Sequence, residues 1–337
     1  MATRDDVARA AGVSASTVSY AISGRRAISE ATRARVFAAM RDLDYTPNAF
    51  ARGLAGATKG FLALHYPLRE EGMSPMEVRY FLTAAAAARK HGFQLLLWTN
   101  STEDLQPLQE FISQRLVDGV VLMEVAGDDP RVRLLTERDV RFVLLGRNAN
   151  PAGLAHVDTD FESVARTALE HVVDRGHRRV LFVGGAPFTP GRGGHGPTVR
   201  TVTELERIAP RYGVDLRTWS GPRAYGSGRE AYRHFRSAAP DTTAVVLFND
   251  PATIGFVHAA ELDGLSIPAD VSVLSIGMGE DAGELNPPVS SVTPKVAELT
   301  EAAVRILVAS VEGHPEANRE LLFDAPLIDR GSVRRLS

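Results

Sequence analysis

The sequence predicts a small all-α helix-turn-helix headpiece followed by an α/β body of two doubly wound lobes. Two observations predict this fold class. Residues 3–24 show two short helical patterns joined by a turn, and residues from 60 onward alternate apolar runs with helical segments in two series of similar length. Continuous apolar strands between helices are typical of parallel sheets covered on both faces. At 337 residues the chain is long enough for both parts.

The first two expected helices form the helix-turn-helix. Thr3 and Asp6 make a capping box at the start of the first helix, and Gly12 ends that helix. Ser14 can cap the second helix. In a helix-turn-helix, the second helix enters a DNA major groove. The apolar faces of the two helices comprise Val7, Ala8, Ala11, Val18 and Ile22.

A third helix and a basic charge complete the headpiece. Ser29 is the expected N-cap, and the expected apolar stripe comprises Val36, Met40 and Leu43, with Phe37 beside them. An ordinary helical hairpin would show the same periodicity. Residues 1–59, however, carry nine Arg or Lys and five Asp or Glu, a net charge of +4 in a chain of net charge −3. A basic headpiece on an acidic body is typical of DNA-binding proteins that have a separate ligand-binding or partner domain.

The body is expected to hold two series of strands and helices, and a ligand would sit between the lobes, outside the carboxyl ends of the strands. The expected strands cover residues 61–66, 95–98, 120–123 and 142–145 in the first series, and 180–183, 244–248 and 271–276 in the second. The expected helices cover residues 76–91, 105–116, 161–175, 198–212, 229–237 and 251–263.

Composition excludes several classes of protein. The chain has no cysteine, which excludes disulfides and thiolate metal sites. No apolar run approaches the length of a membrane span, and the N-terminus enters a polar capped helix at once, so we expect a cytoplasmic protein without a secretory signal. The glycine-rich residues 191–196 lack the Lys-Ser/Thr of a phosphate-binding loop, and the histidines lack metal-ligand spacing. We expect no cofactor, no metal and no catalytic residues.

The headpiece resembles that of the lactose-repressor (LacI/GalR) family of bacterial transcription regulators, with almost no gaps over residues 3–56. The resemblance rests on Asp6, Val7, Ala8, Ala11, Gly12, Val13, Ser14, Thr17, Val18, Ser19, Arg33, Val36, Leu43, Tyr45, Pro47, Asn48, Ala51, Arg52 and Leu54. It continues less closely in residues 175–179, 248–255, 264–273 and 291–294. It implies a body like a periplasmic sugar-binding protein, whose chain crosses between the lobes three times.

The resemblance implies three parts of the chain. We expect a helix-turn-helix domain at 1–46, a hinge helix or linker at 47–59, and an effector-binding and dimerisation domain at 60–337. Within the effector-binding and dimerisation domain, the N-lobe covers about 60–160 and 293–322, and the C-lobe covers about 161–292 and 323–337. The hinge is too short for a stable isolated helix, so we expect it to fold only on DNA beside its dimer mate. A plain linker remains the alternative.

Base reading and phosphate contact are assigned by the same resemblance. The expected base-contacting residues are Ala15, Ser16 and Tyr20 on the second helix, with Leu54 and Ala55 in the hinge. Leu54 matches an apolar wedge that enters the minor groove, where such wedges unstack a base step and bend the duplex. Tyr20 could instead pack on the headpiece. The expected phosphate contacts, which position the domain without reading sequence, are Thr17, Ser19, Arg25 and Arg26.

Effector binding is expected at Asp160, Arg200 and Asn249. Two alternatives remain: Arg200 could be a solvated helix residue, and Asp158 could replace Asp160. Where the family has an acid pair, this sequence has Gly277 and Met278. A site that has lost a hydroxyl-binding carboxylate demands fewer hydroxyls on its ligand. We therefore expect a ligand that is less polyhydroxylated than a simple hexose and can carry an anionic group for Arg200, or else no ligand at all.

The sequence therefore indicates a sequence-specific DNA-binding transcriptional regulator. We expect a repressor that binds an inverted-repeat operator as a homodimer, with an affinity that a small molecule in the interlobe cleft modulates. The alternatives are a regulator without a small-molecule ligand, an enzyme with a DNA-binding headpiece, and a solute-binding protein. Whether the ligand releases or strengthens DNA binding stays open.

Overall fold

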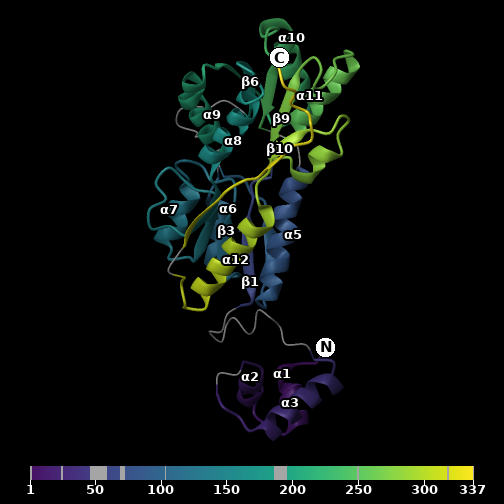
Figure 1. The fold of residues 1–337 in the computed structure, drawn as a ribbon. Helices are drawn as coiled ribbons and strands as arrows, with labels where there is room; N and C mark the ends of the chain where they lie inside the picture. Colours follow the sequence, from purple (N-terminus) through teal and green to yellow (C-terminus); the bar gives the residue numbers. More distant parts are fainter. Residues whose placement is uncertain are drawn as a thin grey trace. The chain divides into compact units, whose positions relative to one another are not determined.

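The computed structural model describes residues 2–23, 26–45, 59–68, 73–102, 104–185, 196–248, 250–316 and 319–336. The chain divides into two compact units, one of residues 1–61 with 114–118 and one of 62–113 with 119–337. The first unit holds the headpiece, and the second holds the α/β body (Figure 1).

Three helices form the headpiece: α1 (Arg4–Ala11), α2 (Ala15–Ser23) and α3 (Glu30–Asp42). The capping box is present, because Asp6 N donates to Thr3 Oγ1 at 3.3 Å and Thr3 N donates to Asp6 Oδ2 at 2.9 Å. Gly12 ends α1 in the left-handed region at φ +66°, where glycine carries no steric cost. Ser14 Oγ accepts from Thr17 N at 3.1 Å, as a cap of α2 should.

The headpiece core differs in one detail from the expected stripe on α3. Leu43 is 36% exposed, so the prediction that it belongs to the apolar stripe was wrong, and Phe37, beside the stripe, is 37% exposed. The helix ends at Asp42 and Leu43 is its C-cap, which takes Leu43 out of the helical repeat. The buried residues are Val7, Ala8, Ala11, Val18, Ala21, Val36, Ala39 and Met40. From α3, the core takes Val36, Ala39 and Met40.

The N-lobe is built on a sheet of strand order β2-β1-β3-β4-β5-β11. Its strands are β1 (Phe61–His65), β2 (Gln94–Trp98), β3 (Gly119–Leu122), β4 (Phe142–Leu145), β5 (His156–Thr159) and β11 (Glu320–Phe323). Its helices are α5 (Pro75–Lys90), α6 (Gln106–Ser113), α7 (Pro130–Glu137) and α12 (Val296–Val311). Helices α5 and α12 pack against each other and share one buried apolar cluster with the sheet.

The C-lobe repeats the same strand order as β7-β6-β8-β9-β10-β12. Its strands are β6 (Arg179–Gly184), β7 (Asp215–Ser220), β8 (Ala244–Leu247), β9 (Ser272–Ile276), β10 (Ser290–Val292) and β12 (Leu327–Ile328). Its helices are α8 (Phe161–Val173), α9 (Gly196–Ile208), α10 (Tyr225–Ala238) and α11 (Asp250–Leu262), with short 3-10 turns η1 (Ala209–Tyr212) and η2 (Gly279–Gly283). Separate apolar clusters bury α8 with α9 and α10 with α11.

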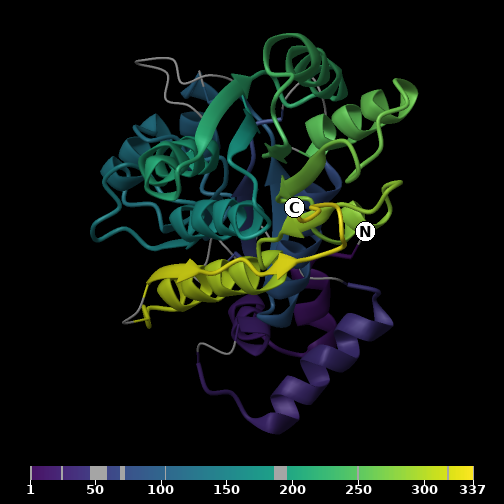
Figure 2. The same ribbon diagram turned by 45° about the horizontal axis from the view of Figure 1, so that its top comes forward.

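The strands pair in parallel from β1 through β3, β4 and β5 to β11, and from β7 through β6, β8 and β9 to β10, whereas β12 runs antiparallel to β10. The chain crosses between the lobes three times: from β5 into α8, from β10 into α12, and from β11 to β12. The last crossing is the yellow C-terminal segment in Figure 2. Two doubly wound lobes with three crossovers confirm the fold class predicted from the sequence.

Candidate functional sites

The candidate base-reading residues on α2 differ in accessibility. Ser16 is exposed, whereas Ala15 is half-buried against the headpiece core. Tyr20 is also half-buried, and the Arg26 guanidinium lies 5.9 Å from the centre of its ring. A cation at that distance stabilises the ring position. Ser16 is therefore the most available of the three for a partner, and Tyr20 is held in place by a basic residue.

The candidate phosphate contacts are partly engaged within the headpiece. Ser14 Oγ and Thr17 Oγ1 lie 2.8 Å apart. Ser19 Oγ donates to Ala15 O at 3.1 Å and accepts from Arg4 Nη1 at 3.4 Å. Arg4 is thus a basic side chain beside α2 that the sequence pattern did not single out. The expected contacts Arg25, Leu54 and Ala55 lie outside the described residues.

A cavity in the body is lined from both lobes, with about 850 Å³ of space when its open mouth is included. Most of its walls come from residues at or just beyond the carboxyl ends of strands of the two sheets, which is where ligands bind in doubly wound folds. The lining residues are Met76, Glu77, Tyr80, Met123, Glu124, Val125, Leu145, Gly146, Arg147, Val157, Asp158, Thr159, Phe161, Pro197, Arg223, Phe248, Asp250, Ile276, Gly277, Pro294 and Leu299.

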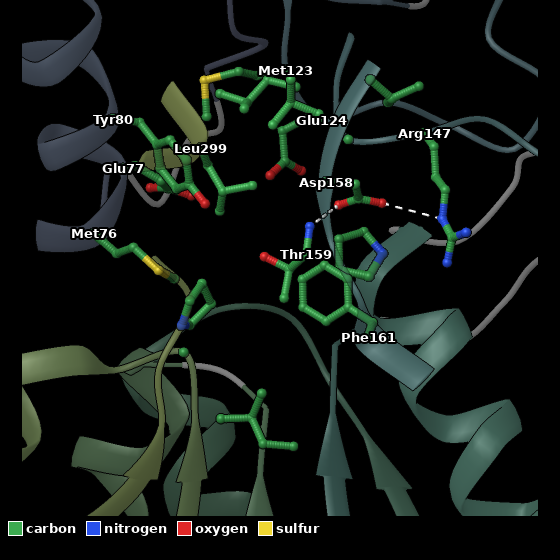
Figure 3. Close-up of a pocket in the computed structure, with 18 of the residues that line it drawn as sticks. Met76, Glu77, Tyr80, Met123, Glu124, Arg147, Asp158, Thr159, Phe161 and Leu299 are labelled. Carbon is green, nitrogen blue, oxygen red and sulfur yellow. Dashed lines mark hydrogen bonds and ion pairs between the residues drawn. The ribbon is translucent and has the colours of Figure 1, made fainter. Parts of the chain in front are cut away.

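At one end of the cavity, a buried carboxylate is held by two arginines. Figure 3 shows one of these pairs, Asp158 with Arg147. Asp158 Oδ2 lies 2.6 Å from Arg200 Nη2 and 3.4 Å from Arg147 Nε. Burial raises the pKa of Asp158 to about 6, although both arginines act to lower it. Arg147 also pairs with Glu162 at 2.6 Å, so the four groups balance in charge.

The opposite end of the cavity is lined by more acidic than basic side chains among the described residues. Arg223 lies 3.4 Å from Glu77 Oε1 and 3.7 Å from Glu124 Oε1. Asp250 is a third carboxylate there, 5% exposed, and burial raises its pKa to about 6 against the opposing effect of Arg223. Figure 3 shows Glu124 between Glu77 and Asp158 at the edge of the open space.

A fully buried arginine supports the loop that presents Glu124. Arg131 Nη2 donates to the carbonyl oxygens of Met123 at 3.0 Å and Glu124 at 2.9 Å, and Arg131 pairs with Asp129 at 2.6 Å. Its Nη1 donates to His65 Nδ1 at 2.8 Å. Burial and the adjacent Arg131 lower the pKa of His65 to about 4, so the ring is neutral and its Nδ1 can accept this bond. Glu124 has a φ of +53°, a left-handed conformation that costs free energy in a residue other than glycine, and the hydrogen bonds from Arg131 hold it in place.

The expected effector residues lie in different places. Arg200 contacts Asp158 and therefore touches the cavity wall. Asp160 caps α8, since its Oδ1 accepts from Ser163 N at 3.0 Å, and it is not among the lining residues, whereas Asp158 is. Asn249 lies outside the described residues.

Several charged lining residues were not selected from the sequence. Glu124, Arg147 and Asp250 each follow the end of a strand by no more than three residues, and this position is a signal that could have found them. Arg223 precedes α10 and Glu77 lies in the first turn of α5, where no strand end marks them. Gly277 stands where the family has one of its two acids, and a Cβ at this position would lie 3.5 Å from Asp250 Oδ1. Asp250 therefore places a carboxylate close to the position of the missing acid.

Two further findings bear on partners. Within the described ranges, no group of three His, Asp or Glu residues is placed to hold a metal ion. No helix in those ranges combines the length and apolar character needed to cross a bilayer.

Comparison with known proteins finds a family match for each unit and relatives that match nearly the whole chain. Residues 3–48 match the family of bacterial regulatory proteins, lacI family, and residues 169–333 match the periplasmic binding protein-like domain. The HTH-type transcriptional regulator reg1 of Streptomyces lividans is 30% identical over 346 residues, which cover 97% of this chain and 95% of that protein.

Solved structures show the same fold over nearly the whole chain. The complex of the transcriptional regulator CelR with cellobiose has a TM-score of 0.72 at 26% identity and covers 98% of this chain and 100% of that one. The Lac repressor dimer bound to operator and the anti-inducer ONPF has a TM-score of 0.84 at 21% identity, with 99% of each chain covered. By headpiece, body and overall similarity, the chain belongs to the lacI family of bacterial regulatory proteins and is a DNA-binding helix-turn-helix transcriptional regulator.

Proposed function

We propose that this protein is a repressor that binds an inverted-repeat operator as a homodimer, and that a small molecule in the body cavity modulates its DNA affinity. The observation that carries the proposal is the presence, in one chain, of a helix-turn-helix unit and of a cavity lined from two lobes. We also propose the domain limits 1–46, 47–59 and 60–337. Because the partner is operator DNA, the proposed site of action is the cytoplasm.

The cavity supports an effector role. Its walls combine apolar residues with a few charged groups, which is typical of small-molecule sites. CelR, at 26% identity, has been solved with cellobiose. A ligand that contacts both lobes favours one spacing of the lobes over another. If that spacing affects DNA binding, the coupling free energy is of the order of 1–3 kcal/mol.

An exposed apolar surface supports the dimer. Leu82 on α5 is 66% exposed and Val78 on the same helix is 38% exposed. Leu96 and Leu97 are exposed on β2, the edge strand beside β1. Burial of these side chains by a second copy of the chain would remove apolar surface from water.

Selection from random duplex DNA on the full chain can identify the proposed operator. The enriched sequence is then footprinted at several salt concentrations. We expect a symmetric protected site and an affinity that falls steeply with salt, because phosphate contacts release counterions. An asymmetric footprint, or an affinity that does not depend on salt, would argue against the proposal.

One observation favours a second candidate, a regulator that needs no small-molecule effector. Among the described residues, three sets of ion pairs join the lobes directly: Arg200 with Asp158, Arg223 with Glu77, and Arg79 with Asp281 at 3.0 Å. Under this candidate, operator affinity stays constant across a metabolite panel in a quantitative binding assay. A change in affinity with any one compound rejects it.

A further inference from the structure

Asp118, the residue before β3, binds the backbone at the end of the proposed hinge. Lys59 N donates to Asp118 Oδ1 at 2.9 Å. Gly60 N and Phe61 N donate to Asp118 Oδ2 at 2.8 Å and 3.3 Å. One carboxylate thus accepts from three successive N–H groups. We call Lys59, Gly60, Phe61 and Asp118 the hinge clamp.

The turn at Gly60 lets these N–H groups converge. Gly60 has a φ of +80°, in the left-handed region that glycine adopts without steric cost. Successive N–H groups in turns of this kind form a concave site for an anion. Here the anion is a carboxylate of the same chain, and hydrogen bonds to a charged acceptor are stronger than those between neutral groups. The clamp is therefore a well-matched contact between a carboxylate and the backbone.

Two further hydrogen bonds join the same segments. Asp118 N donates to Phe61 O at 2.8 Å, next to the parallel pairing of β1 with β3. Lys59 Nζ donates to Val117 O at 2.7 Å. Burial lowers the pKa of Lys59, and the charge of Asp118 opposes this effect. The ammonium group of Lys59 thus binds the protein itself, although Lys59 was counted with the basic residues of the headpiece and hinge.

Two strands of the N-lobe sheet begin at the hinge clamp. β1 starts at Phe61, and β3 starts at Gly119, directly after Asp118. The residue after β3, Met123, lines the cavity. The clamp therefore fixes the backbone at the point where the chain passes from the proposed hinge into the N-lobe sheet.

We propose, resting on the proposed binding of an inverted-repeat operator by a homodimer, that Asp118 is a positioning residue for DNA binding. By holding the end of each hinge at one place on its N-lobe, Asp118 limits the dimer to one distance between half-sites. Dimers of helix-turn-helix proteins bind half-sites whose spacing matches the geometry of the protein. A hinge whose end can shift accepts more than one spacing.

The test measures how strictly the full chain discriminates half-site spacing. Affinity is measured for the operator that selection identifies, for the same operator with a base pair inserted at its centre, and for unrelated duplex DNA. We expect the wild type to prefer the selected operator over the lengthened one. In Asp118→Asn, this preference should fall by roughly fivefold or more, the lower end of typical coupling between sites. The physical reason is that an amide offers one acceptor oxygen and turns an NH2 group toward the backbone donors.

Affinity for unrelated DNA serves as an internal reference. It depends on the positive charges that contact phosphates, which Asp118→Asn does not remove, so it should stay close to that of the wild type. Asp270→Asn is the matched control for charge. Asp270 Oδ2 accepts from Ser266 N at 2.7 Å in the C-lobe, and its replacement should keep the wild-type preference for spacing.

A second pair of variants changes the backbone and leaves Asp118 charged. Among the described residues, no atom beyond the chain neighbours lies within 4 Å of a Cβ added at Gly60 or at Gly313, whose φ is +84°. Both Gly60→Ala and Gly313→Ala therefore strain a left-handed residue without a clash. Gly60→Ala should relax the preference for spacing as Asp118→Asn does, whereas Gly313→Ala, beyond α12, should not.

The wild type alone tests the proposed function, and the variants test the inference. If the wild type binds no symmetric site, the proposed function fails and the inference fails with it. If the wild type binds the selected and the lengthened operator equally, the proposed function stands and the inference is wrong. The same holds if Asp118→Asn and Gly60→Ala are folded dimers that keep the wild-type preference. If Asp118→Asn does not fold, Gly60→Ala decides.

Discussion

At the residue scale, two buried carboxylates of the cavity differ in what surrounds them. Asp158 has two arginines within 3.4 Å, whereas Asp250 shares one arginine with two other acids. The pKa of each is raised to about 6 by burial. Asp158 is therefore an ion-pair partner that joins the lobes, whereas Asp250 has no ion pair as close as those of Asp158 among the described residues.

The raised pKa of Asp250 predicts a specific pH dependence of stability. In the unfolded chain this carboxyl titrates near 3.8, so between there and about pH 6 the native state binds more protons than the unfolded state. The free energy of unfolding therefore falls as the pH rises through this window. Relative to Asp250→Asn, the wild type should lose roughly 1–3 kcal/mol from pH 4 to pH 7 in urea titrations. A difference between the two proteins that is independent of pH would contradict this.

Sequence reading by the headpiece is predicted to depend on Ser16 and Tyr20. Ser16→Ala should change preference at defined operator positions by about 1–3 kcal/mol, because an exposed hydroxyl can bond a base edge. Tyr20→Ala should do the same, with some loss of stability because Tyr20 is half-buried. Arg25→Ala is the control, since the resemblance assigns Arg25 to phosphate contact and its loss should weaken all sequences about equally. The measurement is selection of bound sequences from random DNA with each variant. If the selected motif is the same as that of the wild type, the substituted residue does not read bases.

At the element scale, helices α10 and α11 meet backbone to backbone. A Cβ on Gly228 would lie 2.1 Å from Ala252 O, and one on Gly255 would lie 2.1 Å from Tyr225 O. Such distances cannot be accommodated without a shift of one helix. The two glycines therefore set the distance between these helices, which cover one face of the C-lobe sheet.

This close approach predicts opposite effects for two glycines of α10. Gly228→Ala should lower the free energy of unfolding by about 1–3 kcal/mol, because the added methyl forces the helices apart. Gly226→Ala, whose Cβ would meet only a flexible Arg229 nitrogen at 3.9 Å, should raise it by up to about 1 kcal/mol through helix propensity. Denaturant titration of both variants checks this, and equal effects would contradict the packing argument.

The elements predicted from the sequence are those with strong apolar runs. The strands β1, β2, β3, β4, β6, β8 and β9 were expected because each contains a short continuous apolar segment. β5 was not expected as a strand, because its polar residues His156 and Asp158 interrupt the pattern although both are buried. β7 is half-exposed at an edge and reads as polar.

Two helices were missed for different reasons. The start of α12 has no side-chain cap, since Lys295 at the N-cap makes no capping hydrogen bond, so the usual start signal is absent. α7 has such a signal, Asp129 followed by Pro130, although its helix is short and was not among those expected. In the cavity, Arg223 and Glu77 could not be found from local pattern, because only the folding of two lobes brings them within 3.4 Å.

At the scale of the whole molecule, the exposed apolar residues predict that the α5–β2 face joins two copies of the chain. Leu82→Asp should convert a dimer into a monomer in analytical ultracentrifugation and weaken operator binding, because a charge replaces an apolar side chain that is 66% exposed. Leu322→Asp on β11, at the opposite edge of the same sheet, is the matched control and should stay dimeric. A dimer that survives Leu82→Asp would place the interface elsewhere.

The central claim is that the state of the cavity is coupled to DNA binding. The most direct measurement is the operator affinity of Asp158→Asn, which weakens the pair with Arg200 that joins the lobes and leaves the headpiece unchanged. A coupling of about 1–3 kcal/mol predicts an affinity that changes by roughly 5- to 150-fold, in a protein that remains folded and dimeric. An operator affinity equal to that of the wild type in such a protein would contradict the claim.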